Sequence, residues 1–272
     1  MRITVKHETR YFYKTPPKSI VQILRLTPRS HEGQHVLSWR IDCDADCHLK
    51  KNEDAFGNIT HTLTVDRPVE NMTLTVEGDV ETFDTAGVVR NAVERFDPLV
   101  FLRETSLTTP SAAIRELAAR STSIETLDRM HDLMKAIHGH MTFDTGATNV
   151  ETSAGEAWEL GRGVCQDYAH IFIAAARCAG VPARFVSGHF FRSDDVVDQV
   201  AGHAWAEVYI EDLGWVGFDP ANSVCLYENH IRIACGLDYL YAAPVRGARI
   251  AGAGETMRVN VAVAQASVQL QS

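Results

Sequence analysis

Residues 161–170 read GRGVCQDYAH, and this stretch decides how the rest of the chain is organised. The two glycines around Arg162 favour a tight turn, and the apolar run from Cys165 to about residue 179 predicts a helix. The run stops at Gly180, a residue type that commonly ends helices. Cys165 is therefore expected at a helix N-terminus, where free N–H groups and the helix dipole favour a thiolate.

The strands expected downstream bring two further polar residues toward this cysteine. Period-two patterns predict strands at 183–191, 203–210 and 214–218, and a short turn joins the last two. His203 begins one strand of this hairpin and Asp219 follows the other, so the two can be neighbours across it. A thiol, an imidazole and a carboxylate can serve as nucleophile, general base and orienting group.

The segment upstream of the glycine turn is predicted to be mainly helical. Residues 111–120 are rich in helix formers and follow a proline, and apolar residues recur at steps of three or four over 127–141. Residues 142–156 contain many threonines and glycines and are expected to form a loop. Helices followed by a sheet are typical of an α+β fold.

The first third of the chain has a strand pattern instead. Such a series of short strands, separated by turn-forming residues, predicts an antiparallel β-sandwich. The alternation returns over 257–270 and favours one more strand, added to the N-terminal sheet. The N-terminal runs that alternate apolar and polar residues are 2–13, 36–49, 59–65 and 71–82.

Length and composition fit two globular domains. The chain has 272 residues, more than one domain usually contains, and its 45% hydrophobic and 22% charged residues are ordinary values. We expect a β-sandwich domain over 1–105 and a catalytic core over 106–272, within which 254–272 can return to the N-terminal sheet.

Charge and sorting signals exclude several classes of function. The formal net charge is −9 and no Lys/Arg run could follow a phosphate backbone, so nucleic-acid binding is not expected. The N-terminus offers no apolar stretch for a signal peptide or a membrane span, so we expect a cytoplasmic protein without a membrane partner. Six cysteines in such a chain are expected to stay reduced.

Two clusters near the run 36–49 raise the question of a metal. In a single strand the two cysteines of the run face one side and the histidine the other, which argues against zinc. The acidic series lacks the glycine and the terminal glutamate of a calcium loop. No metal and no cofactor are therefore expected. The residues concerned are Cys43, Cys47, His48, His35 and His61 for zinc, and Asp42, Asp44 and Asp46 for calcium.

Three segments resemble the motif blocks of the transglutaminase-like superfamily in order and approximate spacing. They are GRGVCQDYAH (161–170), HAWAE (203–207) and GWVGFDP (214–220). In addition, LRLTPRSHEGQHVLSWRI (24–41) resembles the β-rich region that precedes the catalytic core in one bacterial subfamily. The resemblance implies a papain-like core of helices packed on an antiparallel sheet, and bacterial members are often provisionally assigned as cysteine proteases.

Carried over residue by residue, the resemblance makes Cys165 the nucleophile, His203 the general base and Asp219 the third member of a triad. The oxyanion needs at least two donors, and the candidates are the backbone N–H of Cys165, Gln166 and Asn149. Four aromatic residues are candidates for lining the cleft, although aromatic residues beside strands more often pack in a core. These are Trp158, Tyr168, Trp205 and Trp215.

The expected activity is hydrolysis of an amide through a thioester on the cysteine. The same triad would serve a transglutaminase, in which an amine replaces water, and a binding module with a vestigial triad is the alternative outside the enzymes. The expected substrate is a peptide or protein amide. The N-terminal domain is expected to shape the cleft, to bind a protein partner or to support a homo-oligomer.

Overall fold

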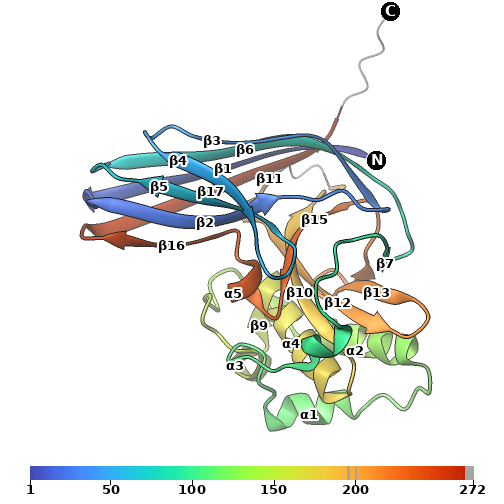
Figure 1. Cartoon of the computed structure of the whole chain (residues 1–272). Helices are drawn as coiled ribbons and strands as arrows, with labels where there is room; N and C mark the ends of the chain where they lie inside the picture. The colour runs from blue at the N-terminus through green and yellow to red at the C-terminus, as the bar shows by residue number, and fades with distance from the viewer. Residues whose placement is uncertain (195–196, 200, 267–272) are drawn as a thin grey trace, which may run out of the picture.

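Long antiparallel strands lie above a smaller body of helices and strands (Figure 1). This computed structural model describes residues 1–194, 197–199 and 201–266. The strands are β1 (Arg2–Thr15), β2 (Ser19–Thr27), β3 (Gln34–Cys43), β4 (His48–Glu53), β5 (Ile59–Val65), β6 (Asn71–Thr82), β7 (Val88–Val89), β8 (Thr142–Phe143), β9 (Arg162–Gly163), β10 (Ala183–Phe190), β11 (Asp198–Gln199), β12 (His203–Ile210), β13 (Gly214–Asp219), β14 (Val224–Cys225), β15 (His230–Gly236), β16 (Val245–Ile250) and β17 (Ala253–Gln265). The helices are α1 (Ala112–Ala118), α2 (Thr126–His140), α3 (Ala154–Leu160), α4 (Cys165–Cys178) and α5 (Tyr239–Ala242), with a short 3-10 helix at Pro98–Leu102.

One sheet of the upper part joins the beginning and the end of the described chain. Its strand order is β11-β17-β1-β6-β3, and β17 runs antiparallel to β1 from the Ile3–Gln265 pair to the Thr15–Ala253 pair. Alternate residues of β1 are buried, which is the pattern of a strand with one face against a core. The last strand therefore lies on the N-terminal sheet, while residues 267–272 of the predicted segment lie outside the described residues.

A second sheet packs on the first and completes a β-sandwich. Its order is β16-β2-β5-β4, and β16 pairs antiparallel with β2. Buried residues from both sheets, such as Leu24, Leu63, Met72 and Leu74, form the core between them. The predicted N-terminal sandwich is confirmed, and it receives two strands from the C-terminal end of the chain. The predicted boundary at residue 105 stays a prediction.

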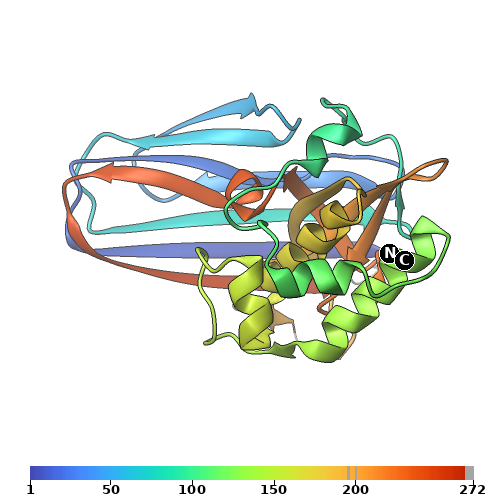
Figure 2. The same ribbon diagram turned by 90° about the horizontal axis from the view of Figure 1, so that it is seen from below.

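The lower body is the α+β core that the sequence predicts. Its sheet has the order β14-β13-β12-β10-β15, with β7 paired to β13. Helix α4 packs against β12 and β10, and every residue from 166 to 177 is buried. Seen from below, the green and yellow helices gather on one side of the strands (Figure 2). No helix of the described ranges is long and apolar enough to cross a membrane.

The run 36–49, predicted as one strand, is two strands, because the chain turns after Cys43. Asp44 donates its N–H to the carbonyl oxygen of Thr73 at 3.1 Å, and its carboxylate accepts from the N–H of Thr73 at 2.7 Å. The chain then crosses to the second sheet, where β4 begins at His48 and pairs with β5. Apolar and polar residues alternate through the crossover as well, so the sequence pattern does not indicate where the first strand ends.

Helix α3 begins inside the stretch 142–156 that was predicted as a loop. Ser153 and Glu156 form a reciprocal cap, in which the Ser153 N–H donates to the Glu156 carboxylate at 2.8 Å and the Ser153 hydroxyl accepts from the Glu156 N–H at 3.4 Å. Gly161 ends the helix with φ +65°, which suits a residue without a Cβ. The Ser-x-x-Glu spacing is a helix-start signal that the prediction overlooked.

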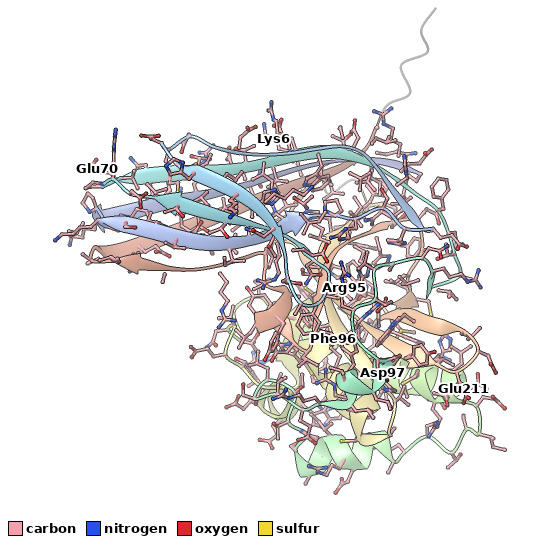
Figure 3. The ribbon with its side chains drawn as sticks, viewed as in Figure 1. Lys6, Glu70, Arg95, Phe96, Asp97 and Glu211 are labelled. Atoms are coloured by element: carbon pink, nitrogen blue, oxygen red, sulfur yellow. The ribbon has the colours of Figure 1, made fainter. Side chains whose placement is uncertain are left out.

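The segment between β6 and α1 is tied to both parts of the molecule. Arg95 donates to Glu53 of β4, with 3.0 Å between Nε and Oε1. Its neighbour Glu94 accepts from Arg184 of β10, with 2.7 Å between Oε2 and Nη1. Figure 3 labels Arg95 where the sandwich meets the lower body. These contacts link the sandwich to the catalytic sheet.

A buried ion network lies in the middle of the catalytic sheet. The Glu207 carboxylate, fully buried on β12, binds Arg184 Nε at 2.7 Å and Arg232 Nε at 2.8 Å. The guanidinium of Arg184 also lies 3.8 Å from the ring centre of Trp215. Burial opposes ionisation of Glu207, but the charges of Arg232 and Arg184 outweigh it and lower its pKa to about 2. The network therefore joins β12, β10 and β15 by charge.

Glu207→Gln is expected to lower the free energy of unfolding by roughly 3–5 kcal/mol, because it leaves two guanidinium groups without their counter-charge in a buried site. The folded-state pKa of Glu207 is depressed from 4.5, so its stabilisation is present above pH 4.5 and is lost as the pH falls toward 2. Urea unfolding at several pH values checks both points.

The matched control is Glu53→Gln, which removes a carboxylate that binds Arg29 and Arg95 at the surface. Its unfolding curve should stay close to that of the wild type, because exposed ion pairs contribute little. Equal destabilisation by the two substitutions, or a difference between wild type and Glu207→Gln that does not shrink at acid pH, would contradict the role of the buried network.

Candidate active site

Hydrogen bonds to the carboxylate of Asp167 stabilise the turn before α4. Oδ2 of this residue accepts from the N–H of Val164 at 2.7 Å and from the hydroxyl of Thr148 at 2.6 Å. A Cβ on Gly163 would overlap the same carboxylate, so only glycine fits there. Cys165 follows as the first residue of the helix and is half-buried. The turn thus presents the sulfur at the helix N-terminus.

The hairpin of β12 and β13 brings His203 and Asp219 together. His203 is the first residue of β12 and Asp219 the last of β13, and the paired register of the hairpin reaches Ala206 and Phe218. His203 Nε2 lies 2.7 Å from Asp219 Oδ2. The His203 side chain is 12% exposed and that of Asp219 is fully buried. The pair therefore has one side open to solvent and one side closed.

The nucleophile lies near this pair. Cys165 is close enough to His203 to contribute, as a minor cause, to the raised pKa of the ring. Because Nε2 of His203 faces Asp219, Nδ1 is the ring nitrogen left for the sulfur. Burial lowers the pKa of His203, but the charge and the hydrogen bond of Asp219, with a smaller effect of Cys165, outweigh it and raise the pKa to about 10. At neutral pH the imidazole is therefore a cation that carries a hydrogen on each ring nitrogen.

Two residues outside the sequence motifs also bind Asp219. Asn222 donates its side-chain N–H to Oδ2 at 2.7 Å and its backbone N–H to Oδ1 at 3.2 Å. Buried His230 approaches Oδ2 with Nε2 at 3.2 Å. Burial raises the pKa of Asp219, but the charge of His203 and the hydrogen bonds of His203 and His230 keep it far below its usual range. Asp219 is therefore a carboxylate at every ordinary pH.

The sequence offered no direct signal for His230. It belongs to β15, a strand that the period-two analysis did not predict, and it shares no motif with His203. Asn222 lies three positions after Asp219, a spacing typical of a turn in which an aspartate side chain binds a backbone N–H. That spacing could have pointed to Asn222.

The oxyanion candidates lie in different surroundings. Cys165 and Gln166 are the first two residues of α4, and the helix itself offers no partner to their N–H groups. The Gln166 side chain is buried. Asn149 lies on an exposed loop, where its side-chain oxygen accepts from the N–H of Glu151 at 2.8 Å. The loop uses Asn149 to close a turn, and no contact with Cys165 is described.

The four aromatic cleft candidates are buried and belong to cores. Trp158 stacks on His140 with ring centres 3.9 Å apart. Tyr168 points into the helix–sheet core, and Trp215 lies under the guanidinium of Arg184. Only Trp205 approaches the site, with its ring centre 6.1 Å from that of His203. All four side chains are buried and pack against neighbouring residues.

One group in the described part of the chain has the composition of a metal site. The possible ligand atoms of His203, Asp219 and His230 all lie within 4.8 Å of one another. Both nitrogen–oxygen distances to Asp219, at 2.7 and 3.2 Å, are those of hydrogen bonds. The arrangement is explained without a metal.

Comparisons with known proteins find two protein families that match parts of this chain. Residues 113–220 match the family described as "Transglutaminase-like superfamily", and this range includes the three residues of the site. Residues 3–81 match the "Bacterial transglutaminase-like N-terminal region", which covers the first six strands of the sandwich.

Several whole proteins are similar over most of the chain. An uncharacterized protein of Mycobacterium leprae is 29% identical over 267 residues, which cover 90% of this chain and 92% of that protein. An uncharacterized protein of Mycobacterium tuberculosis is 28% identical over 272 residues, 90% of this chain and 87% of that protein. A solved structure from Cytophaga hutchinsonii, provisionally assigned as a cysteine protease, has a TM-score of 0.80 with 20% identity and covers 100% of this chain and 92% of its own.

The solved structure establishes the fold, and the two family matches together extend over the sandwich and the site. On these matches residues 113–220 belong to the transglutaminase-like superfamily and residues 3–81 to the bacterial transglutaminase-like N-terminal region.

Proposed function

We propose that this protein is a cysteine-dependent amide hydrolase in which Cys165, His203 and Asp219 act as a catalytic triad. The observation that carries the proposal is the 2.7 Å hydrogen bond between the imidazole and the buried carboxylate, with Cys165 near enough to contribute to the raised pKa of the ring. A cationic imidazole beside a cysteine at a helix N-terminus is the setting in which a thiol becomes a good nucleophile. Membership of the superfamily agrees with this chemistry.

Acylation follows from the position of the proton. The thiolate of Cys165 forms a bond to the carbonyl carbon of the amide with a lone pair, and the π electrons of the C=O bond move to the oxygen. The imidazolium of His203 then gives its proton to the leaving nitrogen as the C–N bond breaks, which leaves a thioester on the sulfur. Asp219 keeps the ring in place and stabilises its charge during these steps.

The first turn of α4 is the natural oxyanion site. The N–H groups of Cys165 and Gln166 lack partners within the helix. They lie at its N-terminus, which is the positive end of the helix dipole. A carbonyl oxygen bound there gains negative charge as the sulfur adds, so donors already in place stabilise the transition state more than the substrate. Asn149 has no assigned part in this proposal.

Water is the acceptor that we favour for the thioester. The His203 side chain is 12% exposed, and we propose that it takes a proton from a water molecule after acylation. The provisional assignment of the Cytophaga protein agrees with hydrolysis. Transfer to an amine, the transglutaminase reaction, uses the same triad and is the second candidate. The substrate class, a peptide or protein amide, and a cytoplasmic location stay predictions.

An acyl electrophile directed at thiols is expected to label Cys165 stoichiometrically at neutral pH, faster than the other cysteines, because only this sulfur lies beside a protonated imidazole. Peptide mapping by mass spectrometry locates the label. Cys165→Ser should abolish both the fast label and the hydrolysis of amides.

The matched control is Cys178→Ser, which alters the thiol at the other end of α4. It should keep the fast label and the activity. Labelling spread evenly over the accessible cysteines would favour a binding module with an inactive triad.

Asp219→Asn is expected to lower the pKa of His203 from about 10 to below its ordinary 6.5, because burial then acts without the opposing carboxylate charge. In the wild type the raised pKa stabilises the fold fully below pH 6.5, and this contribution is lost as the pH rises through about 10. Titration of the histidine ring by NMR measures the change. Asp79→Asn, on β6 of the sandwich, is the control, and a His203 that still titrates near 10 without Asp219 would contradict the ion pair.

A glutamine-containing peptide supplied with and without a primary amine separates the two acceptors. We expect hydrolysis to dominate even with amine present, since water reaches the open side of His203. Mass analysis of the product distinguishes the acid from the substituted amide. Incorporation of amine well above hydrolysis would replace the proposed hydrolase by a transglutaminase.

A further inference from the structure

His230 is held more rigidly than any other partner of Asp219. Its side chain is 2% exposed, and three aromatic rings surround it. The ring centres of Phe190, Trp205 and Tyr227 lie 4.8, 5.3 and 5.3 Å from its own. The strand β15 that carries it pairs with β10, which in turn pairs with β12. The imidazole therefore has little freedom to turn.

The hydrogen bonds of His230 assign its tautomer. Burial lowers its pKa, with Asp219 opposing, so the ring is neutral at neutral pH. A carboxylate only accepts, so Nε2 must carry the hydrogen that faces Asp219 Oδ2 at 3.2 Å. Nδ1 then accepts from the backbone N–H of Tyr227 at 3.4 Å, while the Tyr227 carbonyl oxygen, also 3.4 Å from Nδ1, accepts from the backbone N–H of His230 at 3.0 Å. The carboxylate, which can only accept, thus selects the tautomer.

Asp219 needs such a donor for a physical reason. Its carboxylate is fully buried, and a buried charge is costly unless hydrogen bonds satisfy it. Asn222 supplies two bonds, one from its side chain and one from its backbone, but this residue is exposed and lies in a turn. Only His230 is both buried and enclosed by packed rings. Without it, the carboxylate could rotate about its Cβ–Cγ bond and lose its alignment with His203.

We infer that His230 is a positioning residue of the active site, which donates from Nε2 to Asp219 and thereby fixes the carboxylate against His203. This inference rests on the proposed function, since it concerns the reactivity of Cys165. His230 acts through Asp219 and does not touch the reacting atoms. The site is therefore a chain of four residues, in which the last member sets the geometry of the first three.

The test compares His230→Phe, which keeps an aromatic ring and removes the donor, with His230→Gln, whose side-chain N–H can replace Nε2–H. The rate at which iodoacetamide alkylates Cys165 at pH 7 needs no substrate and is measured by mass spectrometry. His230→Phe is expected to slow this rate roughly tenfold to a hundredfold, the range for a lost hydrogen bond to a charged group. His230→Gln should keep at least about a third of it. With a small amide as substrate, kcat should fall more in His230→Phe than in His230→Gln, while KM stays unchanged in both.

His189→Phe is the matched control, because it makes the same substitution on β10 at an equally buried histidine. Neither ring nitrogen of His189 has a hydrogen-bond partner among the described residues. The rate of alkylation should therefore stay at the wild-type value. Thermal unfolding of all three variants separates loss of reactivity from loss of fold.

The outcomes are distinct. A wild-type rate in His230→Phe, or an equal loss in His230→Phe and His230→Gln, would overturn the inference and leave the triad in place. A wild-type Cys165 that reacts no faster than Cys178 would overturn the proposed function and the inference with it. If His230→Phe does not fold, 15N NMR of the wild-type ring decides: a neutral Nε2–H tautomer at pH 7 supports the inference, and an Nδ1–H tautomer or a doubly protonated ring overturns it.

Discussion

The contact between the buried carboxylate of Asp219 and the ring of His203 is the constraint on which the site depends. A carboxylate without solvent must be neutralised, protonated or surrounded by donors, and here it has a cationic partner and further donors. The same contact keeps the proton on His203, which gives the sulfur of Cys165 a positive neighbour. Removing the carboxylate would therefore alter the charge of the ring and, through it, the nucleophile.

The fold serves this contact by fixing the elements that carry it. Glu207 lies four positions after His203 on β12, and its two arginines join that strand to β10 and β15. Arg184 of this network also binds Glu94, so the segment that leads from the sandwich is attached to β10, the strand beside the one that carries His203. On the other side, the Asp167 cap sets where α4 begins. Charge pairs and a helix cap thus hold the two halves of the site in register.

Local patterns in the sequence were sufficient to predict the helix and the strands that carry the site. The glycine turn and apolar run predicted α4 within a residue of its observed ends, and alternation predicted β10, β12 and β13. Contacts that depend on the order of strands could not be predicted this way. His230 meets Asp219 only because β15 lies beside β10, and single-strand periodicity carries no information about neighbours. The burial of the four aromatic candidates likewise depends on which elements pack against them, so their place in the cleft stays a prediction.

The central claim is that His203 and Asp219 act on Cys165 as one unit, and a double-mutant cycle tests it most directly. The rate of acylation would be measured for the wild type, His203→Ala, Asp219→Ala and the double variant. The account predicts that the double variant acylates about as fast as His203→Ala alone, because Asp219 has no route to the sulfur except through the ring. Losses that multiply independently in the double variant would contradict it.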